Sequence, residues 1–144
     1  MSADPGSTAE LFQLDETTCL SLLTTQHLGR PVVDGGDPAV VPVNYRLVDG
    51  VIAFRTEAGS RADGADRQQV MFEVDMFDDR TRSGWSVLVR GRLVAKSLDD
   101  TSVSIDTWAP GLRDRRITIS LDVVSGRLLR SAPDSSTDRV GGYL

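Results

Sequence analysis

Short runs in which apolar and polar residues alternate recur along most of the chain. The clearest run covers residues 70–77, where Val70, Phe72 and Val74 alternate with residues that include Glu73. A period of two places the apolar side chains on one face of a strand, so each run predicts a half-buried β-strand. The runs predicted as strands are 28–33, 39–48, 51–56, 70–77, 85–93 and 115–124, with 127–129 as an extension of the last.

Short turns and a few candidate helices connect these runs. Asp49-Gly50 is the strongest two-residue hairpin signal in the sequence, and it joins the second and third runs. Apolar residues recur at helical spacing over residues 15–26, with Asp15 as the expected N-cap. Two further helical segments are expected, a polar turn or two at 60–68 and a short helix at 98–107.

This succession of strands predicts a mainly β protein with few short helices, most simply a small antiparallel β-barrel. The β–α–β alternation of a parallel sheet is missing, and so is the glycine-rich fingerprint of a dinucleotide-binding fold. We expect a flexible N-terminal arm over residues 1–14, a single domain over 15–130 and a C-terminal tail over 131–144.

Composition narrows the classes of function. The chain has 144 residues and a formal net charge of −5, which argues against nucleic acid or an anionic membrane as its partner. No apolar run approaches the ~20 residues of a membrane-spanning helix, and the N-terminus does not look like a signal peptide. The single cysteine, Cys19, excludes an internal disulfide and fits a reducing compartment, so we expect a cytoplasmic protein.

The end of the run 51–56 carries the most specific chemical signal. Arg55 and Thr56 are followed by a turn through Gly59, and Ser60 and Arg61 begin the next segment. Guanidinium groups, hydroxyls and free backbone N–H groups at one place are the donors that hold a phosphate. The simpler alternative for Arg55 is an ion pair with an acidic residue of a nearby strand, Glu73 or Asp75.

Two other places offer side chains for a flat ring. Asn44 and Tyr45 lie before the hairpin. Either Asn44 satisfies backbone groups at a bulge and Tyr45 belongs to the core, or the edge and side chains of this strand contact a flat heteroaromatic ligand. Trp85 and Ser86 either add a wall to such a site or belong to the core or a dimer interface. We find no convincing acid–base pair, nucleophile or metal site, because His27 is the only histidine.

The ordered set of these segments resembles the pyridoxamine 5′-phosphate oxidase-like FMN-binding split-barrel family, in its small actinobacterial-type branch related to nitroimidazole reductases. The matching segments are GR at 29–30, VPVNY at 41–45, IAFRTEAGSR at 52–61, FEVD at 72–75, GWSVLVRG at 84–91, WAPG at 108–111 and VSGR at 124–127. The resemblance implies an antiparallel, Greek-key split β-barrel that forms a homodimer, with FMN in two clefts between the subunits.

Matching positions also imply roles for individual residues. Val43, Asn44 and Tyr45 would lie along the flavin ring, and Trp85 and Ser86 would complete the cleft. The ribityl phosphate would be received by Arg55, Thr56, Ser60 and Arg61, of which Arg61 stands where members usually carry lysine.

The function implied by the resemblance is that of an FMN-dependent oxidoreductase, acting on an unidentified small molecule with a nicotinamide or a reduced deazaflavin as electron donor. Two alternatives stay open. The same cleft would suit the deazaflavin F420, as cosubstrate or in place of FMN, or the chain is a non-catalytic binder of flavin, haem or another small ligand. Oxidation of pyridoxamine phosphate itself is disfavoured, because the sequence offers no second basic cluster for a substrate phosphate.

Overall fold

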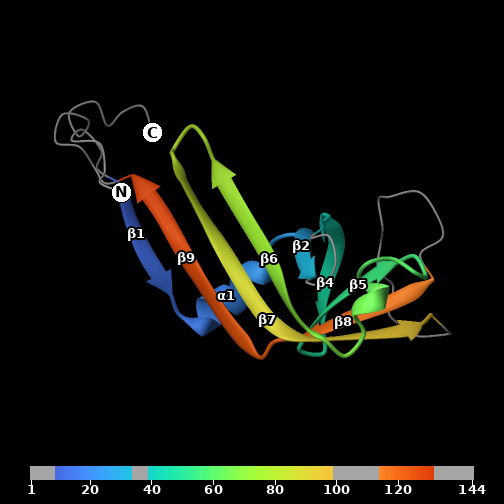
Figure 1. Cartoon of the computed structure of the whole chain (residues 1–144). Helices are drawn as coiled ribbons and strands as arrows, with labels where there is room; N and C mark the ends of the chain where they lie inside the picture. The colour runs from blue at the N-terminus through green and yellow to red at the C-terminus, as the bar shows by residue number, and fades with distance from the viewer. Residues whose placement is uncertain (1–8, 34–38, 99–113, 132–144) are drawn as a thin grey trace, which may run out of the picture.

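The computed structural model describes residues 9–33, 39–98 and 114–131, which form an almost entirely β structure (Figure 1). The elements are β1 (Ala9–Leu14), α1 (Glu16–Leu23), β2 (Leu28–Val33), β3 (Ala39–Val40), β4 (Val43–Val48), β5 (Val51–Thr56), the 3₁₀ turn η1 (Asp63–Ala65), β6 (Gln69–Asp78), β7 (Ser83–Ser97), β8 (Arg115–Ser120) and β9 (Val123–Ser131). The expected loop and helix at 98–111 lie largely outside the described residues.

Six strands close into an antiparallel barrel, as the sequence predicted. The closed circuit runs β2–β4–β5–β8–β7–β6 and returns to β2. The hairpin at Asp49 and Gly50 joins β4 to β5, and both residues have positive φ angles (50° and 78°), as a tight hairpin turn requires. The wall formed by β4, β5, β8 and the end of β7 carries the predicted phosphate segment.

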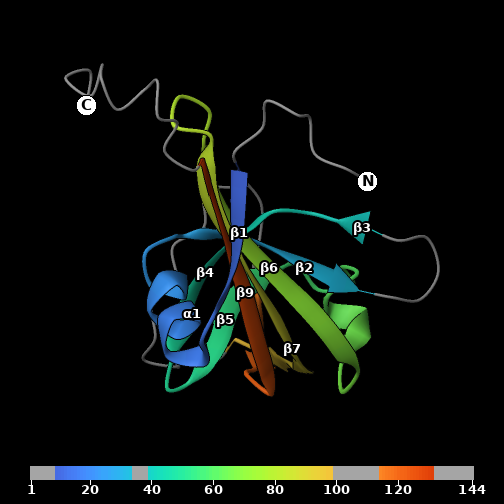
Figure 2. The same ribbon diagram turned by 90° about the vertical axis from the view of Figure 1, so that its left-hand side faces the viewer.

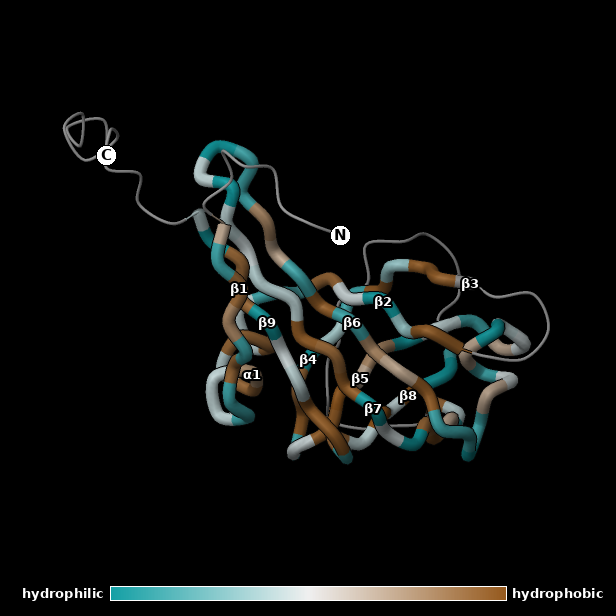
Figure 3. The backbone as a smooth tube through the Cα atoms, turned by 60° about the vertical axis from the view of Figure 1, so that its left-hand side comes forward, coloured by the Kyte–Doolittle hydropathy of each residue, from teal (hydrophilic) through white to brown (hydrophobic). Residues whose placement is uncertain are grey.

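The long strand β7 belongs to two structures at once. Its last five residues pair with β8 in the barrel, and its first part pairs with β6 on one side and β9 on the other. Strands β6, β7, β9 and β1 therefore extend beyond the barrel as a projecting sheet, at the left of Figure 1. Figure 3 shows hydrophobic and hydrophilic positions along these strands. On β7 the alternate residues Trp85, Val87 and Val89 are buried, so they share one face of the sheet.

The N-terminal segment differs from the flexible arm expected for residues 1–14. Ala9–Leu14 forms β1, which pairs along its whole length with the end of β9, from Ala9 opposite Ser131 to Leu14 opposite Gly126. The Arg130 guanidinium lies 4.8 Å from the centre of the Phe12 ring. This order comes from pairing with the distant β9, which the local sequence does not reveal. Residues 1–8 and most of the expected C-terminal tail, 132–144, lie outside the described residues.

Helix α1 covers one side of the structure next to β9 (Figure 2). Asp15 caps it as predicted, because its carboxylate accepts a 2.8 Å hydrogen bond from the Thr18 N–H. Hydrogen bonding to the Thr18 side chain, and then to this N–H, lowers the pKa of Asp15. Cys19 is fully buried on the inner face of the helix, where desolvation raises the pKa of its thiol. A side chain on Gly126 of β9 would collide with the Cys19 sulfur, so this glycine permits the close approach.

Three expected elements are shorter or divided in the structure. The expected strand 39–48 is split into β3 and β4 by Val41 and Pro42, because proline cannot donate a ladder hydrogen bond. The expected strand 115–124 is likewise two strands, β8 and β9, separated at Leu121 and Asp122. The polar segment 60–68 contains only the single turn η1.

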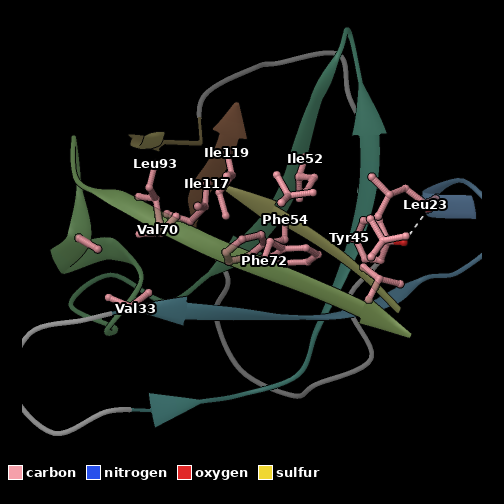
Figure 4. Close-up of a cluster of buried hydrophobic side chains, with 14 of the residues drawn as sticks. Leu23, Val33, Tyr45, Ile52, Phe54, Val70, Phe72, Leu93, Ile117 and Ile119 are labelled. Atoms are coloured by element: carbon pink, nitrogen blue, oxygen red, sulfur yellow. Dashed lines mark hydrogen bonds between the residues drawn. The ribbon is translucent and has the colours of Figure 1, made fainter. Parts of the chain in front are cut away.

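The barrel core is built around aromatic rings in contact, one pair edge to face and one pair stacked (Figure 4). Tyr45 and Phe54 both contact Phe72, with ring centroids 5.2 Å and 6.1 Å apart respectively. Ile52, Ile117 and the neighbouring aliphatic residues fill the space between the walls with no exposed area. Tight packing of this kind fixes the strands, and therefore the positions of the polar side chains on their outer faces.

Candidate functional site

The residues predicted to form the binding site fall on two faces of the barrel wall and on the turn after β5. Side chains alternate along a strand, so Tyr45 and Thr56 point inward with Phe54. Asn44 and Arg55 occupy the alternating outward positions. Four members of the predicted set are packed against or within the interior, namely Val43, Tyr45, Thr56 and Trp85.

Tyr45 is the most deeply placed of these residues. Its exposed fraction is 2%, its hydroxyl donates a 2.6 Å hydrogen bond to the Leu23 carbonyl, and burial raises its pKa well above the ordinary value. Figure 4 shows this bond at the edge of the core. The ring therefore anchors α1 to the barrel, and only the backbone of this part of β4 faces outward with Asn44.

Trp85 and Ser86 separate in the same way on β7. Trp85 belongs to the buried core, with an exposed fraction of 6%. Ser86 lies on the opposite face, between Asp75 of β6 and Arg127 of β9 in the strand register. Only Ser86 of the pair is placed to meet a ligand on the outer face of this sheet.

The turn after β5 brings Thr56 and Ser60 together, as the sequence suggested. The Thr56 hydroxyl donates a 2.8 Å hydrogen bond to Ser60 Oγ, which also accepts a 3.2 Å bond from the Asp63 N–H. Gly59 adopts a positive φ of 80°, which lets the chain reverse between these hydroxyls. Arg61, the next predicted residue, is exposed in this turn.

Two backbone donors of this turn already bind carboxylates of the chain. The Gly59 N–H donates to Asp63 Oδ2 at 2.8 Å, and the Ala58 N–H donates to Asp114 Oδ1 at 3.2 Å. Asp63 also accepts a 2.8 Å bond from Arg115 Nε. The Gly59 hydrogen bond, opposed by partial burial and assisted by Arg115, lowers the pKa of Asp63, so this carboxylate stays ionised. An incoming phosphate must therefore rely on side-chain cations rather than on these two N–H groups.

The cations beside this turn form a larger set than the sequence suggested. Arg55 is the Cα partner of Arg116 on β8, which is itself the partner of Lys96 on β7. The Nε atom of Arg116 is buried without a hydrogen-bond partner among the described residues. Arg55, Arg116 and Lys96 therefore form one cross-strand row of basic residues on this wall.

A second polar cluster lies on the outer face of β2 and β6. Arg30 Nη1 is 3.2 Å from Glu73 Oε1 and 3.6 Å from Asp75 Oδ1, so Arg30 takes the ion pair that the sequence offered to Arg55. Burial, together with the Asp75 carboxylate, raises the pKa of Glu73 to about 7, while Arg30 opposes this shift. Glu73 is therefore a carboxyl group that changes its charge near neutral pH.

Glu73 also lines a cleft of about 440 Å³ on the projecting sheet. Other residues that line it are Ser86 and Leu88 of β7, Arg127 of β9 and Gln13 of β1. The segment FEVD at 72–75 does not reveal Glu73 as a titrating group, because its burial and its proximity to Arg30 depend on the pairing of β6 with β2. Within the described ranges, no group of three or more histidine, cysteine or acidic residues is arranged to hold a metal ion.

The chain matches known proteins over most of its length. A family model described as pyridoxamine 5′-phosphate oxidase matches residues 15–128. The uncharacterized protein Rv0080 of Mycobacterium tuberculosis is 32% identical over 147 residues, which cover 94% of this chain and 95% of that protein. Within the described ranges, no helix combines the length and apolar character that crossing a membrane requires.

Solved structures agree with the fold. The FAD binding protein from Mycobacterium smegmatis gives a TM-score of 0.64 at 27% identity, over 83% of this chain and 98% of that one. A FAD-binding protein from Mesorhizobium loti gives a TM-score of 0.66 over 85% of this chain and 99% of that one, and at 23% identity the likeness concerns the fold alone. The split barrel and the long sequence match together show that this chain belongs to the pyridoxamine 5′-phosphate oxidase family.

Proposed function

We propose that this protein binds a flavin on the outer face of the wall formed by β4 and β5. The observation that carries the proposal is the cationic set at the end of β5, where Arg55 on the strand and Arg61 in the turn flank the hydroxyl pair of Thr56 and Ser60. Charge-assisted contacts from guanidinium groups are the strongest hydrogen bonds that a protein offers to a phosphate. The FAD-binding relative from M. smegmatis, 27% identical, supports a flavin as the ligand.

The isoalloxazine ring is then expected beside β4. The outward side chain of Asn44 and the backbone of residues 43–45 would contact it, because Val43 and Tyr45 turn their side chains inward. Thr56 contributes indirectly, since its hydroxyl orients Ser60 at 2.8 Å. Ser86 and the cleft on the projecting sheet supply further polar surface for the ligand or for a second molecule.

The activity we propose is that of an FMN-dependent oxidoreductase acting on an unidentified small molecule, with a nicotinamide or deazaflavin electron donor. A bound flavin would supply the hydride chemistry, and the protein would supply binding, orientation and electrostatics. Glu73 is placed to hold a proton at its carboxyl group near neutral pH, in a cleft that a small molecule fits. Ordinary acid–base residues elsewhere are not needed for this division of roles.

We also propose that the protein acts as a homodimer. The projecting sheet exposes an apolar row formed by Leu11, Leu129 and Phe77, which lie side by side in the strand register across Gly84. Their exposed fractions of 60%, 36% and 57% are large for such side chains. A second copy of the chain would cover this row. Light scattering tests this, because Phe77→Glu should lower the mass in solution from that of a dimer to that of a monomer. The same mass for the variant and the unaltered protein would contradict the proposal.

The function is tested by titrating the purified protein with FMN and, separately, with F420, following cofactor fluorescence. We expect saturable FMN binding that weakens in the variant Arg55→Gln/Arg61→Gln. Each lost charge-assisted contact is worth roughly 1.5–3 kcal/mol, so each substitution should weaken binding by about 10- to 100-fold. Arg90→Gln, which removes an exposed arginine from β7, is the control for a lost positive charge.

The outcomes separate the candidate functions. FMN binding that is insensitive to the double substitution would place the phosphate elsewhere and contradict the proposed site. Binding of F420 without FMN would assign deazaflavin chemistry to the same face. Tight flavin binding without reduction by any nicotinamide or deazaflavin donor would instead indicate a non-catalytic flavin binder.

A further inference from the structure

The cleft on the projecting sheet is lined by four polar side chains that the fold does not use. They are Gln13, Ser86, Ser125 and Arg127. Within residues 9–33, 39–98 and 114–131, none of these side chains forms a hydrogen bond or an ion pair. A few polar groups that converge on a cleft without internal partners are typical of a ligand-binding site.

The strand register gathers these groups around one apolar residue. Leu88 of β7 is the Cα partner of Glu73 on β6 and of Ser125 on β9. Ser86, two residues before Leu88 and therefore on the same face, is the partner of Arg127. Cross-strand neighbours are about 5 Å apart and residues two apart on a strand about 7 Å, so these polar groups surround Leu88 within the span of a small molecule.

The lining of the cleft holds one cation and one carboxyl group, which have different partners. Glu73 contacts Arg30, whose Nη1 lies 3.2 Å from Glu73 Oε1. Arg127 stands two strands away from Glu73, roughly 10 Å at the backbone, and no ion pair joins them. The guanidinium of Arg127 is therefore the charged group of this cleft that can receive an anion from outside.

Another arginine of β9 shows how the protein holds such a side chain by itself. Arg130, three residues after Arg127 and on the opposite face, has its guanidinium 4.8 Å from the centre of the Phe12 ring. Among the described residues, Arg127 is given neither a ring nor a carboxylate of this kind. The contrast between the two arginines distinguishes a residue that supports the sheet from one that faces the cleft.

The size and charge of the cleft favour a small monoanion. Its volume of about 440 Å³ lies within the range of about 300–1,000 Å³ that is usual for small-molecule sites. The planar fork of one guanidinium matches the two oxygens of one carboxylate. A dianion would instead bring a second negative charge toward Glu73 and Asp75 without a second available cation in the lining.

We propose that this cleft binds a small carboxylate with an apolar body, with the carboxylate group at Arg127 and Ser86 and the body over Leu88. The proposal gives a chemical class to the second molecule that acts beside the flavin. Binding of the carboxylate needs no cofactor, and only its use as a substrate rests on the proposed function.

Glu73 makes this binding depend on pH. The charged groups around it are Arg30 on β2, Asp75 on its own strand, Arg127 on β9 and Arg90 on the outer face of β7. Burial and then Asp75 raise the pKa of Glu73 to about 7, so this group gains a negative charge as the pH rises from 6 to 8. A carboxylate ligand is ionised throughout this range, so its affinity should fall by up to about 10-fold.

The test is isothermal titration calorimetry with benzoate as the probe and benzamide as its uncharged counterpart of similar shape. We expect benzamide to bind at least about 10-fold more weakly, and Arg127→Gln to weaken benzoate binding by roughly 10-fold, as the loss of a charge-assisted contact should. Arg130→Gln, which removes an arginine from the opposite face of the same strand, is the matched control and should change the affinity by less than about 2-fold. Glu73→Gln should bind benzoate equally at pH 6 and pH 8. Thermal unfolding checks that all three variants fold.

Titrations without cofactor and with saturating FMN separate this inference from the proposed function. If the protein binds no flavin but binds benzoate, and Arg127→Gln weakens that binding, the carboxylate site stands and the flavin assignment fails. Displacement of benzoate by FMN would make the cleft a part of the flavin site and would overturn the inference. Absence of benzoate binding, equal affinities for benzoate and benzamide, or an unchanged affinity in Arg127→Gln would overturn it as well.

Discussion

Glu73 makes the stability of this protein depend on pH in an unusual direction. Its carboxyl group lies opposite Arg30 on β2 and Leu88 on β7 in the strand register, with Asp75 on its own strand and Arg127 bordering the same cleft. Burial is the main cause of its raised pKa, about 7 against an ordinary value of 4.5. The folded protein therefore binds a proton that the unfolded chain releases at intermediate pH.

The sign and size of the effect follow from proton linkage. Because the folded state holds more protons than the unfolded state between the two pKa values, the free energy of unfolding falls as pH rises through this range. With a pKa of about 7 in the folded protein in place of 4.5, the free energy of unfolding should fall by about 2–3 kcal/mol between pH 5 and pH 8. This uses about 1.4 kcal/mol per pKa unit. The side chain is 27% exposed, so most of this effect should survive solvent screening.

The perturbation is Glu73→Gln, which keeps the shape and neutrality of the protonated acid. Its amide oxygen can still accept the hydrogen bond from Arg30, which is 3.2 Å long in the unaltered protein. The variant should gain about 2–3 kcal/mol relative to the unaltered protein on going from pH 5 to pH 8, because it has no proton to lose. Urea unfolding at several pH values, followed by circular dichroism, measures both profiles.

Glu10→Gln is the control, since it removes an exposed carboxylate from β1 of the same projecting sheet. Glu73 does not titrate as inferred if the free energies of unfolding of Glu73→Gln and the unaltered protein differ by the same amount at pH 5 and at pH 8. A stability of the unaltered protein that rises with pH over this interval would also contradict the inference, because the sign of the linkage would then be reversed.

Two further predictions concern hydrogen bonds that hold the site in place. Tyr45→Phe should lower the free energy of unfolding by about 1–3 kcal/mol, because it leaves the Leu23 carbonyl without the donor now 2.6 Å away; urea unfolding checks this. Asp63→Asn should lower the free energy of unfolding by about 1–2 kcal/mol at pH 7, because Gly59 and Arg115 both lose their charged acceptor. This second difference should shrink as pH falls below 3.8, because Asp63 stabilises the fold only while ionised, and a gap that persists in acid would argue against it.

Much of the fold could be predicted because most strands of this chain carry a local alternation of apolar and polar residues. The runs ending at Val33, Val48 and Thr56 coincide with the ends of β2, β4 and β5. The strand β1 was missed because Ala9–Leu14 is ordered by β9, more than a hundred residues away in sequence. The break at Pro42 was signalled by the residue itself, but its consequence, two separate strands, depends on the register with β2.

The candidate site was predictable only where it is continuous in sequence. The contact between Thr56 and Ser60 lies within one turn and was foreseen as a cluster. The inward orientation of Tyr45 follows from the pairing of β4 with β5, which fixes the face that each residue occupies. Arg116, and the Arg115 that binds the Asp63 carboxylate, reach this turn only through the pairing of β8 with β5. A sequence pattern carries no information about which distant strands become neighbours.

The closure of the barrel has a consequence for how the chain is made. Strand β8 is the element that bridges β5 and β7, and it lies near the C-terminal end of the described residues. During synthesis, the edges of β5 and of the last part of β7 that pair with β8 therefore stay unpaired until β8 is complete at Ser120. Exposed strand edges favour association with other chains. Nascent or truncated chains that stop before Arg115 should thus be the aggregation-prone forms of this protein, and its folding should be timed by the arrival of its late strands.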